Sequence, residues 1–245
     1  MKTFYWTFAA LVLGVILAIS PATAQQPVTA QQPATAQQPV TAQQPVTAQQ
    51  PVTAQQPVTA QKICTQLIDA GTFNDVLVPS NATCTLIESL VQGNIRVDTN
   101  ATLNLIVTTV RGSITVDTNA TLTAAEGTII NGSVLATNAA SISLNQGVTI
   151  DTNLSALGTG TVDVHITFIG GNLFVADAGS ISINLSIING NVDDERNNTG
   201  SGNTNVITDN RIGGNLVCID NTPPPTNLGT PNRVAGNRVG QCAGL

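Results

Sequence analysis

The sequence has 245 residues, of which 42% are apolar and only 9% are Asp, Glu, Lys or Arg. All 14 acidic residues lie within residues 62–245, which also contain Lys62 and all six arginines. This part of the chain therefore carries a formal charge of −7 (7 − 14). This balance excludes the basic surface of a nucleic-acid-binding protein, and an aromatic content of 3% argues against sugar stacking on rings.

The N-terminal segment is typical of a signal peptide over residues 1–24. Lys2 precedes an apolar run at residues 8–19, and residues 21–24 supply the small side chains that a signal peptidase requires. The run is shorter than the ~20 residues of a membrane-spanning helix, and no stop-transfer segment follows it. We therefore expect a secreted protein without a membrane span in the mature chain.

Residues 25–61 form a low-complexity linker of six Gln-Gln-Pro-Val-Thr-Ala copies, with Ala34 replacing the valine in the second copy. A proline in every copy opposes helices and central strands, and the few apolar groups cannot offset the entropy of ordering. The segment is expected to be an extended tether. A stalk that carries O-linked sugar on its threonines is the alternative.

A corner motif, usually Gly-Asn or Gly-Ser, recurs through residues 62–245. The successive intervals are 19, 19, 20, 20, 19, 19, 24 and 22 residues, which indicates a repeat architecture. The corners lie at Asn74-Asp75, Gly93, Gly112, Gly132, Thr152-Asn153, Gly171, Gly190, Gly214 and Gly236.

Within each unit the apolar residues alternate with polar ones, which predicts strands. One unit runs from Gly93 through Ile95 and Val97 to Leu103 and Leu105, and a third short apolar pair precedes the next corner. Three strands and three turns per period predict an all-β, single-stranded parallel β-helix, a β-solenoid of about eight triangular coils spaced ~4.8 Å apart. Gly and Asn are expected to take left-handed backbone conformations at the corners.

The four cysteines form two pairs that are close in sequence, and an exported protein retains disulfides. Four cysteines allow three connectivities. We expect Cys64–Cys84 and Cys218–Cys242, because each spacing is close to one repeat. These bonds would fasten an N-terminal cap at residues 62–73 and a C-terminal cap at residues 218–245.

The end of the chain resembles the closing coils of a group of secreted, mostly bacterial β-helix proteins of uncharacterised function. The similarity lies in Ile212-Gly213-Gly214-Asn215-Leu216-Val217-Cys218, in Asn221-Thr222-Pro223-Pro224-Pro225 and in the final run from Gly236 to Leu245, which ends Gly-Asn-Arg-Val-Gly-Gln-Cys-Ala-Gly-Leu. The resemblance implies a right-handed helix and supplies no catalytic residues.

The densest charge cluster opens the longest repeat unit, at Asp193, Asp194, Glu195 and Arg196. Carboxylates of this kind are weak candidates for a calcium site, and together with Arg196 or Arg211 they suggest a lyase acting on acidic polysaccharide. No general base accompanies them, so the preferred interpretation is a solvated loop without a catalytic residue, metal or cofactor.

Three further features have simple structural interpretations. His165, the only histidine, has no partner for a triad or metal site and is expected on the surface. Threonines in Asp-Thr-Asn turns suggest ice binding, but the rows are interrupted and are expected at turns, not on a flat face. Possible N-glycosylation sequons occur at Asn81, Asn100, Asn119, Asn131, Asn153, Asn184 and Asn197.

These observations predict a secreted, non-catalytic surface, matrix or adhesion component, whose partner would be an extracellular glycan or a surface protein. One alternative is a lyase-like enzyme that uses residues 193–211. The other is an ice-binding protein.

Overall fold

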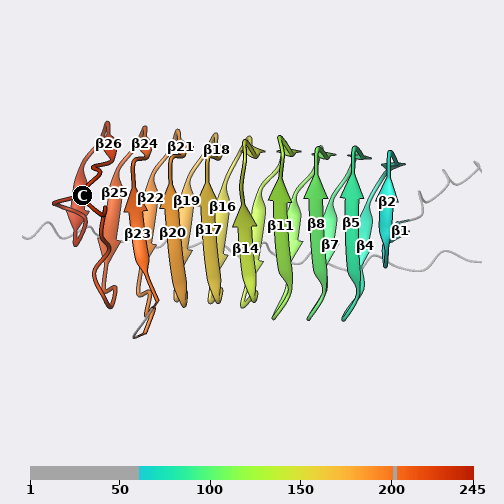
Figure 1. Cartoon of the computed structure of the whole chain (residues 1–245), viewed down its shortest axis with the longest axis horizontal. Helices are drawn as coiled ribbons and strands as arrows, with labels where there is room; N and C mark the ends of the chain where they lie inside the picture. The colour runs from blue at the N-terminus through green and yellow to red at the C-terminus, as the bar shows by residue number, and fades with distance from the viewer. Residues whose placement is uncertain (1–60, 201–202) are drawn as a thin grey trace, which may run out of the picture. The chain divides into compact units, whose positions relative to one another are not determined.

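The structure is a computed structural model that describes residues 61–200 and 203–245, which form a stack of coils built from 27 short strands (Figure 1). The predicted signal peptide and almost all of the linker lie outside the described residues. The strands form three parallel sheets, here called A, B and C, and neighbouring strands in each sheet belong to successive coils. The predicted all-β solenoid is confirmed.

The sheets contain ten, eight and nine strands respectively. Sheet A consists of β1 (Lys62–Ile63), β4 (Val76–Val78), β7 (Ile95–Val97), β10 (Ile114–Val116), β13 (Val134–Thr137), β16 (Leu154–Leu157), β19 (Leu173–Ala176), β22 (Val192–Glu195), β25 (Leu216–Ile219) and β27 (Arg238–Gly240). Sheet B consists of β2 (Leu67–Asp69), β5 (Thr83–Ile87), β8 (Thr102–Ile106), β11 (Thr121–Ala125), β14 (Ser141–Leu144), β17 (Thr161–His165), β20 (Ser180–Asn184) and β23 (Asn205–Thr208). Sheet C consists of β3 (Thr72–Phe73), β6 (Leu90–Val91), β9 (Thr109–Val110), β12 (Ile129–Ile130), β15 (Thr149–Ile150), β18 (Phe168–Ile169), β21 (Ile187–Ile188), β24 (Arg211–Ile212) and β26 (Arg233–Val234).

The core is a set of apolar ladders that run through the coils, as the alternation predicts. Ile95, Ile114 and Val134 stand in register in sheet A, and Leu103 and Leu122 stand in register in sheet B. All five are buried. Because a single coil cannot enclose its apolar edge, each ladder residue is buried by its equivalents in the coils above and below.

The nine strands of sheet C give about nine coils, one more than the number of predicted coils. The difference arises at the N-terminus, because residues 62–73, expected to form a cap, contain β1, β2 and β3 and make a coil of their own. The predicted disulfides are both present, between Cys64 and Cys84 and between Cys218 and Cys242. Each joins one of the terminal coils of the described residues to its neighbouring coil.

The glycine corners do not have the left-handed conformation expected of them. Gly112 has a negative φ, and its glycine is required because a Cβ there would collide with the carbonyl group of Gly93 in the previous coil. The corner backbones approach closely, since the Gly112 N–H donates to the Gly93 carbonyl at 2.9 Å. The residue after the corner glycine adds a second hydrogen bond between the two coils, because Asn94 Oδ1 accepts from the Ser113 N–H at 2.9 Å.

Left-handed residues lie instead at the other two turns of the coil. The turn from sheet A to sheet B has Asn or Asp there in most coils, as at Asn100 (φ 60°) and Asn119 (φ 56°). The turn from sheet B to sheet C, here called the B–C turn, has less suitable residues, including Val107 (φ 50°), Ile166 (φ 50°) and Leu185 (φ 53°).

Within residues 61–200 and 203–245, no helix is long and apolar enough to cross a membrane. The two disulfides are typical of a protein from an oxidising compartment.

Candidate functional site

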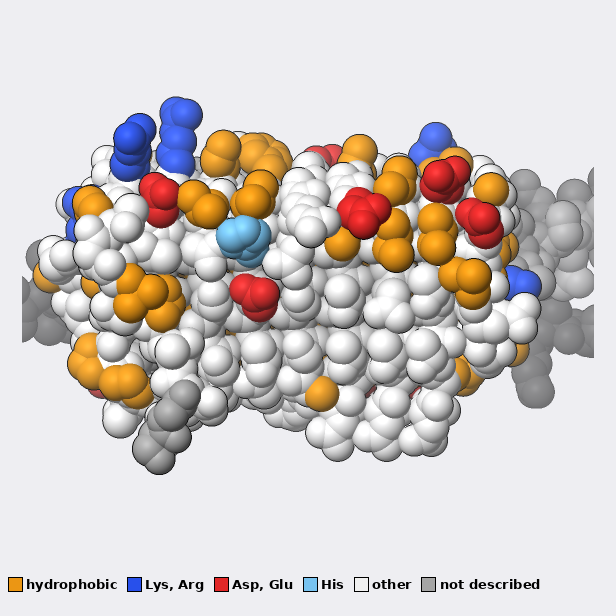
Figure 2. All heavy atoms as spheres, in the orientation of Figure 1, with side chains coloured by type: hydrophobic (Ala, Val, Ile, Leu, Met, Phe, Trp, Pro, Cys, Tyr) orange, Lys and Arg blue, Asp and Glu red, His pale blue; other side chains and the backbone are white. Residues whose placement is uncertain are grey.

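The outer side of sheet B is the most regular surface of the molecule. Its strands point apolar residues such as Leu122 inward, so the alternate residues Thr121 and Thr123 face outward. Figure 2 looks onto this side, which is mostly uncharged, with one histidine and one acidic side chain near its middle. We call the first two outward positions of each of six consecutive strands of sheet B, β5 to β20, the sheet-B face, which has twelve positions. A third outward position ends the five-residue strands and carries Ile87, Ile106, Ala125, His165 and Asn184.

Register turns these positions into two straight rows. Ten of the twelve carry a hydroxyl group, and the exceptions are Asn104 and Asp163. The first row is Thr83, Thr102, Thr121, Ser141, Thr161 and Ser180, and the second is Thr85, Asn104, Thr123, Ser143, Asp163 and Ser182. The array therefore repeats every ~4.8 Å along the stack and every ~6.7 Å along the strands.

The threonines of the Asp-Thr-Asn motifs lie at turns or bends, as expected, and this array is a separate set of residues that the sequence analysis missed. The signal was present in the triplets Thr121-Leu122-Thr123 and Ser141-Ile142-Ser143, whose polar members flank an inward residue. Sheets A and C provide the comparison, because their outward positions mix apolar, charged and polar side chains. The outward residues of sheet C, for example, are Thr72, Leu90, Thr109, Ile129, Thr149, Phe168, Ile187, Arg211 and Arg233.

The hydroxyl groups of this face are largely available to an external ligand. Side chains bond some second-row hydroxyls, as where Asn104 Nδ2 donates to Thr85 Oγ1 at 3.2 Å and Asn184 Nδ2 donates to Ser182 Oγ at 3.1 Å. His165 lies half-buried beside the second row and its Nδ1 contacts Asn184 Oδ1, which confirms its outward position. Its partner is therefore an amide.

The cluster at residues 193–196 is not the solvated loop that we expected. Asp194 faces into the coil and is fully buried, replacing the apolar residue of its ladder between Val175 and Cys218. Three amides enclose its carboxylate. Asn197 Nδ2 donates to Oδ1 at 2.7 Å, while the Nδ2 groups of Asn205 and Asn221 donate to Oδ2 at 3.1 and 2.8 Å.

No cation contacts this carboxylate among the described residues, so burial dominates its titration. Burial raises the pKa of Asp194 to about 6, and the amide donors from Asn205 and Asn197 lower it only in part. Burial, with the nearby charge of Glu195, also raises the pKa of Asp193, which lies half-buried on the outer side of sheet A. The Asn205 Oδ1 atom is buried and has no hydrogen-bond partner.

The residues that a calcium site or a lyase would use are not brought together. Arg196 lies exposed at a turn and pairs with Asp177 and Glu195 at 3.4 and 3.0 Å, whereas Arg211 projects from sheet C. The described residues contain no group of three or more His, Cys, Asp and Glu side chains arranged to hold a metal.

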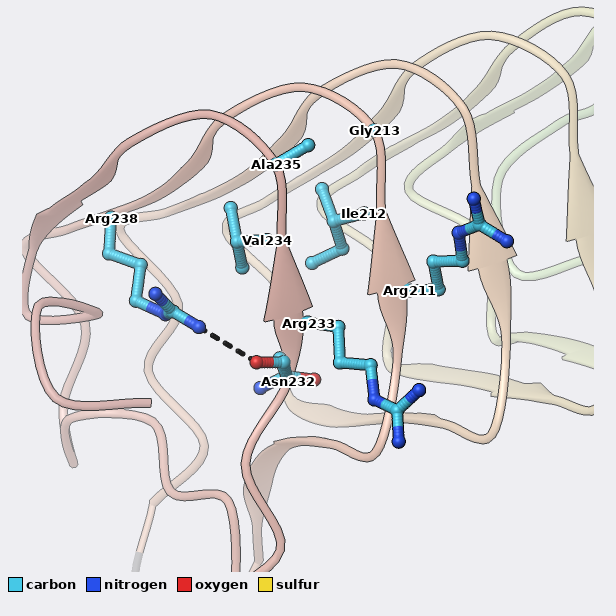
Figure 3. Close-up of a pocket in the computed structure, with 8 residues that line it drawn as sticks. All are labelled: Arg211, Ile212, Gly213, Asn232, Arg233, Val234, Ala235 and Arg238. Carbon is cyan, nitrogen blue, oxygen red and sulfur yellow. Dashed lines mark hydrogen bonds between the residues drawn. The ribbon is translucent and has the colours of Figure 1, made fainter.

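A shallow cavity of about 470 Å³ lies at the C-terminal end of sheet C, and Arg211, Arg233 and Arg238 line it (Figure 3). Arg238 is used internally, because its Nε donates to the Leu245 carbonyl at 2.7 Å and its guanidinium also donates to the Asn232 carbonyl at 2.8 Å. Arg211 and Arg233 are exposed, and neither forms an ion pair within the described residues.

The predicted glycosylation positions differ in accessibility. Asn184 is half-buried, whereas Asn197 is fully buried and uses its Nδ2, the atom that would carry a glycan, to donate to Asp194 and to the Val175 carbonyl. The folded domain therefore leaves no room for a glycan at Asn197. The exposed positions are Asn81, Asn100, Asn119, Asn131 and Asn153.

Comparison with protein families found a match of residues 33–62 to cementoin, the trappin protein transglutaminase binding domain. The matched segment belongs to the Gln-Gln-Pro-Val-Thr-Ala copies and ends where the solenoid begins. Comparison with curated proteins and with solved structures found no match.

Proposed function

We propose that the protein is a secreted, non-catalytic solenoid that binds an extended surface through its sheet-B face, and that this surface is ice. This is one of the two alternatives that the sequence left open, and it differs from the preferred surface, matrix or adhesion component in its ligand. The candidate acid and base residues support a non-catalytic role, since Asp194 is buried, Arg196 is paired with Asp177 and Glu195, and Arg211 lies on a different sheet.

The single observation that carries the proposal is the two-dimensional order of the hydroxyl rows. Each threonine presents a donor, two acceptor lone pairs and a methyl group, so a repeated array can hold water in a repeated pattern. The core fixes the strands before binding, which lowers the entropic cost of meeting a rigid ligand. A periodic face is best matched by a periodic ligand.

The same face is poorly suited to most extracellular glycans. Recognition of sugars commonly uses aromatic rings, and none of the twelve positions carries one. Its only formal charge is that of Asp163, so it offers little to an acidic or basic polymer. For this reason we favour ice over the glycan partner.

The decisive experiment compares two lysine substitutions in the same coil. Thr121→Lys places a long charged side chain in the middle of the array, whereas Thr115→Lys places it on the outer side of sheet A. We expect thermal hysteresis and inhibition of ice recrystallisation in the unmodified protein and in Thr115→Lys, with a loss of at least fivefold in Thr121→Lys.

Two outcomes would contradict this proposal in different ways. If the protein has no effect on ice but binds an insoluble glycan, and Thr121→Lys abolishes that binding, the face is a binding surface and the ligand is wrong. If neither ice nor any solid glycan is affected by the Thr121→Lys substitution, the sheet-B face is not the binding surface.

A further inference from the structure

One inner ladder runs through all ten strands of sheet A, and both of its ends are charged. In chain order the ladder consists of Lys62, Val76, Ile95, Ile114, Val134, Leu154, Leu173, Val192, Leu216 and Arg238. The eight members between the two ends are apolar and buried. At each end of the described stack, a cation therefore occupies the position at which the ladder has an apolar residue in every other coil.

Lys62 lies at the N-terminal end of the core with an exposed side chain. Its register with Val76 places it on the inner side of sheet A, and within the described residues no preceding coil covers it. The Nζ atom lies 6.0 Å from the centroid of the ring of Phe73, the first inner residue of sheet C. A lysine in this position covers apolar surface with its methylene groups and keeps its ammonium group in water. Asp69, in the same coil, is in register with Ile87 and faces outward, away from the core.

Arg238 has the equivalent position at the C-terminal end. Figure 3 shows it on the same side of sheet C as Val234, the last inner residue of that sheet. Its hydrogen bonds to the carbonyl groups of Asn232 and Leu245 hold the guanidinium group in place. A shallow cavity lies at each end of the stack, of about 530 Å³ beside Lys62 and about 470 Å³ beside Arg238.

The backbone of sheet A remains open at both ends. Among the described strands, β1 pairs only with β4, and β27 pairs only with β25. Unpaired strand edges are sites at which another chain can add by hydrogen bonding. Since every neighbouring pair in the sheet is parallel, two copies stacked head to tail would bring β27 of one copy beside β1 of the next.

We propose that Lys62 and Arg238 keep copies of this chain from stacking head to tail into a filament. In the register that sheet A already has, stacking would place Arg238 of one copy beside Lys62 of the next, one coil spacing of ~4.8 Å apart. Neither side chain has an ion pair within the described residues. Two like charges would then leave water together without a counter-ion, which is strongly unfavourable in a protein interior. An acidic residue at one of the two positions would turn the repulsion into an attraction.

The first test is sedimentation velocity of the full chain over a dilution series. Lys62→Glu reverses the charge at one end, and Arg211→Glu is the matched control, because Arg211 is an exposed, unpaired cation on the outer side of sheet C. We expect the unmodified chain and Arg211→Glu to remain unassembled. Lys62→Glu should assemble at concentrations at least tenfold below any at which the unmodified chain does.

A second substitution tests whether the opposite end supplies the attraction. Lys62→Glu combined with Arg238→Glu again places like charges together and should not assemble. Lys62→Glu combined with Arg238→Lys keeps the opposite charges and should assemble. Both double variants lose the guanidinium bonds to the Asn232 and Leu245 carbonyls, so the contrast between them reports the charge and not damage to the terminal coil.

A cross-link tests the head-to-tail geometry. Ile63 on β1 and Val239 on β27 are exposed and belong to one outward row of sheet A, so stacking in register makes them neighbours between copies. Ile63→Cys with Val239→Cys, in the Lys62→Glu chain, should oxidise to a series of covalent oligomers. Ile63→Cys with Thr115→Cys should not, because Thr115 lies in the same row but in the middle of the stack.

Three results would overturn the inference. They are head-to-tail assembly of the unmodified chain, failure of Lys62→Glu to assemble at any concentration, and assembly that is the same with Arg238→Glu as with Arg238→Lys. The sheet-B face takes no part in these contacts, so the outcome is independent of the proposed ice binding.

Discussion

The buried carboxylate of Asp194 gives the protein a pH-dependent stability that one substitution should remove. The pKa of Asp194 rises from 3.8 to about 6 in the folded state, so the folded chain retains a proton that the unfolded chain releases. This contribution to stability is complete below pH ~4 and is lost as the pH rises through about 6. At 1.36 kcal/mol per pKa unit, the loss amounts to ~3 kcal/mol.

Asp194→Asn keeps the size of the side chain and removes its titration. The introduced amide has one acceptor oxygen, whereas Asp194 receives donors from Asn197, Asn205 and Asn221. Rotation of the Asn205 amide would relieve one conflict, because its unpartnered Oδ1 would then accept a hydrogen bond, but the introduced NH2 group would still face the Nδ2 group of Asn221 or Asn197. The variant should therefore be less stable than the unmodified protein at pH 4, and the difference should shrink by up to ~3 kcal/mol as the pH rises to ~7.5.

The assay is guanidinium chloride denaturation of both proteins at intervals between pH 4 and pH 8. The quantity of interest is how the difference in unfolding free energy changes with pH, which cancels titrations common to both proteins. Asp193→Asn, at the half-buried neighbouring position, is the control and should change the difference less. A difference between the unmodified protein and Asp194→Asn that does not vary with pH would refute the reasoning.

Two further predictions concern the terminal coil and the corners. Replacing Cys218 and Cys242 with alanine removes a cross-link between residues 24 apart and should cost ~3 kcal/mol, measured as earlier protease cleavage and hydrogen exchange confined to the C-terminal coils. Unchanged protease cleavage and hydrogen exchange in those coils would contradict this prediction. Gly112→Ala should cost more than ~2 kcal/mol because its Cβ meets the Gly93 carbonyl, whereas Gly127→Ala, at φ 73° with open space around it, should cost ~1 kcal/mol by thermal denaturation. Equal costs would show that close approach of the coils is not the constraint.

The sequence predicted the architecture because the relevant signals are local and repeated. Leu103 and Leu105 alternate with polar neighbours in one coil, and residues about 19 positions away repeat the pattern. The same spacing paired Cys64 with Cys84 correctly. The corner glycines were located correctly, but their role was misjudged. A close contact between two coils cannot be distinguished from a left-handed turn by residue type alone, since both favour glycine.

The candidate surfaces depend on the register between coils, which no single unit contains. Thr121 and Ser141 are neighbours in the array only because β11 and β14 pair in that register. Asp194 was predicted to be solvated because charged side chains are rarely buried without a partner. Its stabilising contacts include Asn221, 27 residues away in the next coil. The sequence therefore determined the coil and its inward residues through alternation, whereas stacking decided which outward side chains form a surface and which carboxylate is enclosed.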